Sequence, residues 1–290
     1  MTPLTPEDLC QLRRDLAEIT RSSPRLRKVA LNPHGRDFVI GDVHGAFDQV
    51  LQGMKAVGFN RLADRLFSVG DLIDRGAGSS RAGAFLDQPY VHAIPGNHEA
   101  DLVDLYLTQD DPCGVLAAVA SINFNGMGWL STTTPDERIA LVKRFASLPI
   151  AMEVQTARGT VGLVHGEVPR GMDWPSFTSA IEAGDKHTIA SCLQGRTRLR
   201  SQDATGVPGI GRIFAGHTPQ FDGATRLGNC YAIDTGAVFA ELSTEPNAAL
   251  TFADMAFKTG ALFTPRPAGD ARVLDDTTDE PFGNYAGPLP

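Results

Sequence analysis

The sequence predicts an α/β fold in which short buried strands alternate with helices. Short apolar runs rich in β-branched and aromatic residues recur from about residue 37 onward, and a glycine-rich polar cluster follows each run. Segments with apolar residues at helical spacing lie between them. Strands that alternate with helices build a domain whose sheet is largely buried. The strand predictions come first, because they place the polar clusters.

Six runs have the length and the flanking residues of buried strands. They are Phe38–Ile40, Leu66–Val69, Tyr90–Ile94, Val161–Val164, Ile213–Phe214 and Tyr231–Ile233. In open α/β sheets, ligands gather beyond the carboxyl ends of the strands. Because polar residues follow each run, we expect residues far apart in the chain to meet at such an edge.

Three helices have recognisable beginnings. The first begins at Thr5–Asp8, an N-cap followed by proline, and ends before Pro24. The second covers Ala46–Val57. The third follows Thr134–Glu137, a capping box with proline at the first helical position.

The chain divides into three parts. Residues 1–35 are predicted to form an N-terminal helical extension, residues 36–250 the central domain, and residues 251–290 a C-terminal extension. The tail from about Pro265 is rich in Pro, Gly, Asp and Thr and poor in aliphatic residues. Such a composition favours an extended or disordered arm.

The net charge of −8 argues against a general binder of nucleic acid or of acidic membranes. A phosphate substrate would also be repelled unless a cleft held strong local positive charge. That requirement points to metal ions or clustered arginines.

The sequence favours a cytoplasmic protein. Its four cysteines are widely spread and form no CxxC pair, which is typical of free thiols in a reducing compartment. The first ten residues lack the basic start and apolar run of a signal peptide, and no stretch approaches eighteen apolar residues. No oligomerisation stripe is evident, so we expect a monomer.

Six polar clusters carry the residues of chemical interest. They are Gly41–Gly45, Gly70–Gly76, Gly96–Glu99, Val164–Gly166, Gly216–Thr218 and Ile233–Gly236. Any one alone is more often structural than functional. Together they supply two carboxylates, one amide and three histidines without a thiolate, a set that suits Mn²⁺, Fe or Zn²⁺ better than a structural zinc site.

Asp71 is central in this set and could place its two oxygens on two ions at once. Two ions about 4 Å apart suit phosphoryl chemistry, because they bind phosphate oxygens and lower the pKa of a bound water. Arg75 would add local positive charge. His98 lies beside Asn97 and could protonate the leaving group if a carboxylate such as Asp74 fixed its tautomer.

The ordered motifs GDVHG, GDLIDRG, GNHE, HG and GHT resemble those of the metal-dependent phosphoprotein phosphatase family within the calcineurin-like metallophosphoesterases. The bacteriophage lambda and bacterial serine/threonine protein phosphatase type is the most similar subgroup. The resemblance covers about Phe38 to Phe239. It implies a central β-sandwich flanked by helices, with a dinuclear metal site at the C-terminal ends of strands.

The resemblance also implies a role for individual residues. The ligands of one metal would be Asp42, His44 and Asp71, and those of the other would be Asp71, Asn97, His165 and His217. His98 would be the general acid, Asp74 its orienting partner, and Arg75 a phosphate-binding residue. A second phosphate-binding arginine is expected before the GHT motif, and Arg196 is our candidate there, ahead of Arg198.

Several nearby residues depart from the family pattern or have a supporting role. Gln194 stands where tryptophan is usual, which leaves local packing and substrate shape open. Asp234 and Thr235 are expected to support the site from behind. Trp129 is expected to pack in the interior. Glu167 follows the HG motif, and the only effect we expect of it is on the edge of the pocket.

The implied activity is hydrolysis of phosphoserine and phosphothreonine in proteins, with phosphotyrosine as a further substrate, by attack of a metal-bound hydroxide. The implied cofactor is a pair of divalent ions, Mn²⁺ first, with Fe or Zn²⁺ as alternatives. A dinucleoside polyphosphate hydrolase or another small-molecule phosphoesterase is the alternative enzyme. A metal-binding scaffold without catalysis is the third hypothesis. The partner would be a phosphoprotein or phosphopeptide, with no nucleic acid and no membrane.

Overall fold

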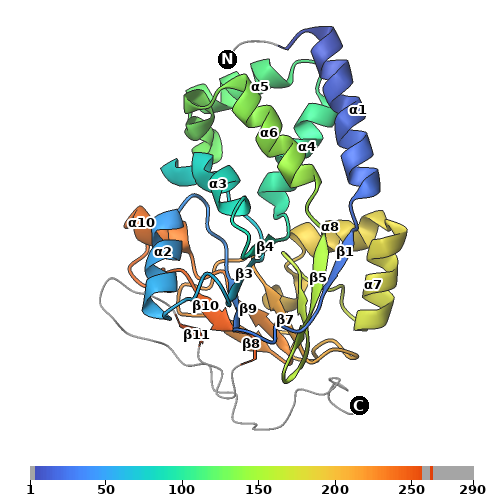
Figure 1. Ribbon diagram of the computed structural model, residues 1–290, viewed down its shortest axis with the longest axis vertical. Helices are drawn as coiled ribbons and strands as arrows, with labels where there is room; N and C mark the ends of the chain where they lie inside the picture. Colours follow the sequence, from blue (N-terminus) through green and yellow to red (C-terminus); the bar gives the residue numbers. More distant parts are fainter. Residues whose placement is uncertain (1–3, 257–261, 264–290) are drawn as a thin grey trace.

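The computed structural model describes residues 4–256 and 262–263 and places two β-sheets between two groups of helices (Figure 1). The predicted α/β class and the central β-sandwich are confirmed. All six predicted strands are present with small shifts at their ends. The prediction for the tail from Pro265 lies outside the described residues.

The first sheet has the strand order β11-β10-β2-β3-β4. Its strands are β2 (Asp37–Ile40), β3 (Arg65–Ser68), β4 (Val91–Ala93), β10 (Phe252–Asp254) and β11 (Leu262–Phe263). Strands β2, β3 and β4 run parallel, and β10 is antiparallel to β2. The three carboxyl ends of the parallel strands therefore lie at one edge.

The second sheet has the strand order β1-β5-β6-β7-β9-β8. Its strands are β1 (Leu26–Val29), β5 (Ala151–Thr156), β6 (Gly159–Leu163), β7 (Arg212–Ala215), β8 (Thr225–Leu227) and β9 (Cys230–Ala232). Strands β6, β7 and β9 run parallel, whereas β5 and β8 are antiparallel to their neighbours β6 and β9. This sheet also brings three carboxyl ends together.

Alternating side chains of the strands in each sheet pack in two different cores. In the first sheet, Val39 and Phe67 point toward the second sheet and pack in one cluster with Phe214. Their neighbours Phe38 and Leu66 point the other way, into the cluster formed by the helices. Because successive side chains of a strand face opposite sides, a sheet buried on both faces needs apolar residues at consecutive positions.

Two groups of helices cover the outer faces. Those packed in the core of the first sheet, with the 3₁₀ turn that leads into α3, are α1 (Pro6–Ser22), α2 (Phe47–Ala56), η1 (Ala77–Arg81), α3 (Ala82–Leu86), α4 (Asn97–Thr108), α5 (Pro112–Ser121), η2 (Phe124–Thr132), α6 (Pro135–Ala146) and α10 (Ala237–Glu241). Helices α7 (Trp174–Ala183) and α8 (Lys186–Gln194) pack on the second sheet, and the short α9 (Thr197–Arg200) follows them.

The helix starts confirm the capping predictions. The Thr5 hydroxyl accepts the backbone N–H of Asp8 at 3.1 Å at the start of α1. At the start of α6, the Thr134 hydroxyl accepts the N–H of Glu137 at 3.2 Å, and the Glu137 carboxylate accepts the N–H of Thr134 at 2.7 Å. These bonds satisfy backbone donors that have no partner inside the helix.

Both predicted extensions contribute strands to the sheets. Strand β1, within residues 1–35, pairs with β5, and β10, within residues 251–290, pairs with β2. Helix α1 also contacts α4 and α6. The described parts of the two extensions are therefore packed into the body of the molecule.

All four cysteines are free thiols, with Cys10 exposed and the other three buried. Across the described residues, no single helix combines the length and apolar composition needed to cross a membrane. Among the described residues, only α5 and η2 taken together have that length and composition, and the two are bent by 110° at their junction.

Replacing Leu16 in α1 by alanine is expected to lower the free energy of unfolding by about 3 kcal/mol, because this fully buried side chain would leave a cavity between helices. Urea unfolding measures the loss. The exposed Glu18 on the same helix provides the control Glu18→Ala, with an expected change within about 0.5 kcal/mol. Equal effects of both changes would show that α1 lies outside the cooperative core.

Candidate metal centre

The carboxyl ends of the parallel strands carry the predicted site residues. They are Asp42 and His44 after β2, Asp71, Asp74 and Arg75 after β3, Asn97 and His98 at the start of α4, His165 after β6, and His217 after β7. The two sheets thus deliver residues of both halves of the chain to one place. Arg196, at the start of α9, joins them through a contact with His217.

Two groups of potential ligands share the carboxylate of Asp71. One group holds His44, Asp71 and His98, and the other holds Asp71, His165 and His217. Within each group the ligand atoms lie within 4.8 Å of one another, and every member is buried. Two groups that share one carboxylate suit a pair of neighbouring cations.

Backbone carbonyls fix the tautomers of two of these histidines. His44 Nδ1 lies 2.7 Å from the carbonyl oxygen of Ile73, and His165 Nδ1 lies 2.8 Å from that of Val69. A carbonyl can only accept, so each Nδ1 carries a hydrogen, and when the imidazole is neutral its Nε2, 3.3 Å from Asp71, presents a lone pair.

His44 Nε2 is buried and has no hydrogen-bond partner among the described residues. Buried polar atoms are rarely left unpaired, and a metal ion would occupy this lone pair. The residues present therefore fit a cation beside Asp71.

Asn97 and His217 complete the second group. His165 Nε2 lies 3.2 Å from Asn97 Oδ1. Burial, together with the charges of His165 and Arg196, lowers the pKa of His217 to about 3, so this imidazole is neutral at pH 7. Its Nε2 accepts an N–H bond from Arg196 Nε at 2.9 Å, so this nitrogen carries a lone pair and no hydrogen.

Asp42 belongs to neither group of ligand atoms. Its carboxylate accepts the backbone N–H of His217, with distances of 3.1 and 2.9 Å to its two oxygens. Burial and the negative charges of Asp234 and Asp71 raise its pKa well above the usual range. A cation nearby would remove this penalty, and the ligand role of Asp42 stays a prediction.

A hydrogen-bonded chain links His98, Asp74 and Trp129. Asp74 Oδ2 lies 2.7 Å from His98 Nδ1, and Asp74 Oδ1 accepts the indole N–H of Trp129 at 2.8 Å. Burial disfavours the charged imidazole, but the bond to Asp74 and the charge of Asp71 outweigh it and raise the pKa of His98. Trp129 is buried as expected, and its contact with Asp74 is a function that sequence reasoning missed.

The two candidate arginines before the GHT motif have different positions. Arg196 reaches the site through its bond to His217. Arg198 is buried elsewhere, where its Nη1 donates to the backbone oxygen of Asp203 at 3.2 Å. Arg75 is held by its backbone N–H, which donates to Asn125 at 3.1 Å, and its guanidinium lies 5.8 Å from the ring centre of Phe239.

Backbone strain concentrates in the loops that carry the site. Positive φ values occur at His44 (46°), Asp71 (48°), Asp74 (67°), Arg75 (63°) and His217 (70°). Such conformations are unfavourable for residues other than glycine and occur often at functional sites. Close approach also requires Gly96, where a Cβ would lie 2.0 Å from Asp71 Oδ1.

Glu99 is a second residue that sequence reasoning left without a role. Its fully buried carboxylate accepts backbone N–H bonds from Gly96 at 2.7 Å, Asp71 at 2.9 Å, Leu72 at 2.8 Å and Ile73 at 3.2 Å. Burial and the charge of Asp71 raise its pKa, and the bond from Gly96 acts against this rise. The signal was its N3 position in α4, a usual place for a capping glutamate.

Asp234 and Thr235 lie behind the site, after β9. Asp234 Oδ1 accepts the N–H of Gly236 at 3.0 Å, and its other oxygen is buried without a hydrogen-bond partner among the described residues. The Thr235 hydroxyl donates to the carbonyl of Ala249 at 2.6 Å. Their supporting role stays a prediction.

This chain is similar to known phosphoesterases. Residues 38–221 match the model of a family described as calcineurin-like phosphoesterase. Serine/threonine-protein phosphatase 1 of Salmonella typhimurium is 29% identical over 205 residues, which cover 70% of this chain and 87% of that protein. The symmetrical bis(5'-nucleosyl)-tetraphosphatase of Serratia proteamaculans is 27% identical over 172 residues, which cover 56% of this chain and 60% of that protein.

The fold is shared with a solved serine/threonine phosphatase structure from Saccharomyces cerevisiae. The TM-score is 0.51 at 15% identity, and the match covers 87% of this chain and 84% of that one. At this identity the likeness shows the fold alone.

Changing Glu99 to glutamine is expected to lower the free energy of unfolding by about 3 kcal/mol, because an amide NH₂ would face backbone donors in a buried place. Urea unfolding in the presence of a chelator separates this effect from metal binding. Glu137→Gln, at the exposed cap of α6, is the control, with an expected loss of about 0.5 kcal/mol. If Glu99→Gln lowered the free energy of unfolding no more than Glu137→Gln does, Glu99 would not stabilise the loop after β3 through its backbone hydrogen bonds.

Proposed function

Because this chain belongs to the calcineurin-like phosphoesterase family, a hydrolase family with a dinuclear centre of divalent metal ions, we propose that it is a protein serine/threonine phosphatase. The observation that carries this proposal is the pair of groups of potential ligands that share Asp71, one of which includes His98 with its bond to Asp74. The match to the Salmonella phosphatase, which covers 87% of that protein, supports the substrate class. Phosphotyrosine is a further proposed substrate, and the acting form is a monomer.

Six residues would hold the two cations. Asp42, His44 and Asp71 would bind one, and Asp71, Asn97, His165 and His217 the other. Oxygen and imidazole donors without thiolate favour Mn²⁺, with Fe and Zn²⁺ as alternatives. When bound, the ions supply positive charge for phosphate oxygens and lower the pKa of a coordinated water.

His98 would donate the proton that the leaving serine or threonine alkoxide needs. Its Nδ1 faces Asp74, so Nε2 is the nitrogen that can give a proton away. The raised pKa keeps a larger share of His98 protonated at neutral pH. Asp74, itself held by Trp129, would fix the ring.

Arg75 and Arg196 would bind the substrate phosphate, since guanidinium groups match phosphate oxygens in charge and shape. Arg196 contacts the same Nε2 of His217 that a cation would use. Cation binding would take this lone pair and leave the Arg196 guanidinium free for an anion. The positive charges of these two arginines would offset the repulsion expected between a chain of net charge −8 and a phosphate.

A dinucleoside polyphosphate hydrolase is the second candidate function. It rests on the similarity to the Serratia tetraphosphatase and would use the same ligands and arginines. A scaffold without catalysis has less support, because it gives no reason for the His98, Asp74 and Trp129 chain.

With Mn²⁺ added, a phosphoserine peptide is expected to be hydrolysed with a kcat/KM about 100-fold above that for diadenosine tetraphosphate. Steady-state assays on the purified protein measure both. Asp71→Asn, which removes a charge from both ligand groups, should abolish both activities and so serve as the control. A higher kcat/KM on the dinucleotide would favour the alternative enzyme.

His98→Ala is expected to lower kcat on a phosphoserine peptide by about 100-fold or more, because the alkoxide leaves without a proton donor. On an activated aryl phosphate the loss should be much smaller, since that leaving group scarcely needs a proton. The exposed His187 provides the control His187→Ala, with unchanged rates on both. Losses of the same size on both substrates, or none, would refute the acid role.

A further inference from the structure

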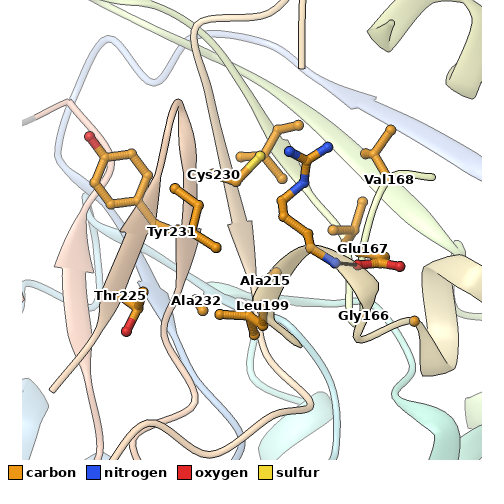
Figure 2. Close-up of a pocket in the computed structure, with 14 residues that line it drawn as sticks. Gly166, Glu167, Val168, Leu199, Ala215, Thr225, Cys230, Tyr231 and Ala232 are labelled. Atoms are coloured by element: carbon orange, nitrogen blue, oxygen red, sulfur yellow. Dashed lines mark hydrogen bonds between the residues drawn. The ribbon is translucent and has the colours of Figure 1, made fainter. Parts of the chain in front are cut away.

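Glu167 follows His165 by two residues and lies against the turn that carries Arg196. Its backbone N–H donates to the carbonyl of Ser191 at 3.2 Å, and the N–H of Gly166 donates to that of Cys192 at 2.5 Å. The segment after β6 is therefore bonded to the last turn of α8. Figure 2 shows Glu167 next to Gly166 on the wall of a small cavity.

The side chain of Glu167 contacts the chain on both sides of Arg196. On the far side, its Oε2 accepts the backbone N–H of Arg198 at 2.7 Å. Arg196 is the N-cap of α9 and has no side-chain cap hydrogen bond of its own, so Glu167 supplies the missing acceptor from another segment.

On the near side, Glu167 packs directly on Gly195. A Cβ at Gly195 would lie 2.4 Å from Glu167 Cγ and 2.8 Å from its Oε1. A Cβ at Gly166 would likewise lie 2.8 Å from the backbone nitrogen of Gly195. The two segments approach so closely that a side chain at either glycine would separate them.

These contacts connect a predicted metal ligand to a predicted phosphate-binding residue. His165 precedes Glu167 by two residues, and Arg196 lies between the two points that Glu167 holds. Arg196 extends to His217 on the other side of the site. Movement of the 195–198 turn would therefore displace the guanidinium from the position where a phosphate would bind.

We propose that Glu167 is a positioning residue, which holds the turn of residues 195–198 so that Arg196 points at the substrate phosphate. The inference rests on the phosphate-binding role proposed above for Arg196. It assigns Glu167 no contact with substrate or metal. Its effect should appear as a change in phosphate affinity that depends on the presence of Arg196.

Calorimetric titration of the Mn²⁺-loaded protein with inorganic phosphate tests this directly. Glu167→Ala should bind phosphate about tenfold more weakly, an effect of the size expected for a lost cap. Glu167→Asp shortens the side chain and moves the carboxylate away from the N–H of Arg198, and it disturbs folding less than alanine does. It should weaken phosphate binding about fivefold. Glu167→Gln keeps an acceptor oxygen and should stay within about twofold of the unchanged protein.

Two further comparisons distinguish positioning from a general structural effect. The exposed Glu182→Ala on α7 should bind phosphate normally, and the Mn²⁺ content of all variants should be the same. In an Arg196→Ala background, Glu167→Ala should cause no additional loss, because the residue through which it acts is absent.

Normal phosphate binding by both Glu167→Ala and Glu167→Asp would overturn the inference, provided that Arg196→Ala weakens binding. An equal loss from Glu167→Ala with and without Arg196 would also overturn it, as would a loss of Mn²⁺. Normal binding by Arg196→Ala would instead refute the role of Arg196 in the proposed function. Absence of turnover of any phosphoester by the unchanged protein would refute the proposed function itself.

Discussion

The buried carboxylate of Asp71 is the constraint on which the rest of the site depends. It lies between His44 and His165, 3.3 Å from the Nε2 atom of each. Asp42 and Asp234 are also buried nearby. Burial raises the pKa of both; the charges of Asp234 and Asp71 add to the rise at Asp42, and the charge of Asp71 adds to the rise at Asp234. Like charges in a region of low dielectric constant are unfavourable unless positive charge accompanies them. A pair of divalent cations would supply that charge, so the donor set and its electrostatics lead to the same conclusion.

Backbone conformation and backbone hydrogen bonds hold Asp71 in this position. Parallel strands bring their carboxyl ends to one edge, and the loops that leave them turn sharply through residues with positive φ, including Asp71 itself. Glu99 gathers backbone N–H groups of the loop after β3 under one carboxylate. Strained residues persist only where their surroundings hold them, and this network holds Asp71 between its two histidines.

Sequence reasoning recovered the parts that short-range patterns specify. The six predicted strands and the capping box at Thr134 depend on neighbours in the chain. Strands β1, β5, β8, β10 and β11 were not predicted. Strand β5, for example, ends without the glycine-rich polar cluster that marked the predicted runs. The link from Trp129 to Asp74 spans 55 residues, and the one from Glu167 to Arg198 spans 31. No local pattern encodes such contacts, because they exist only once the sheets have formed.

Backbone hydrogen bonds hold the chain around Gln194, next to the turn that carries Arg196. A tryptophan there would be expected to anchor the turn by burial, but the Gln194 side chain is exposed and can bury little apolar surface. The N–H of Gly195 donates to the carbonyl of Ser191 at 2.8 Å at the end of α8, and the same oxygen accepts from the N–H of Glu167. Directional bonds to a glycine backbone fix position without bulk.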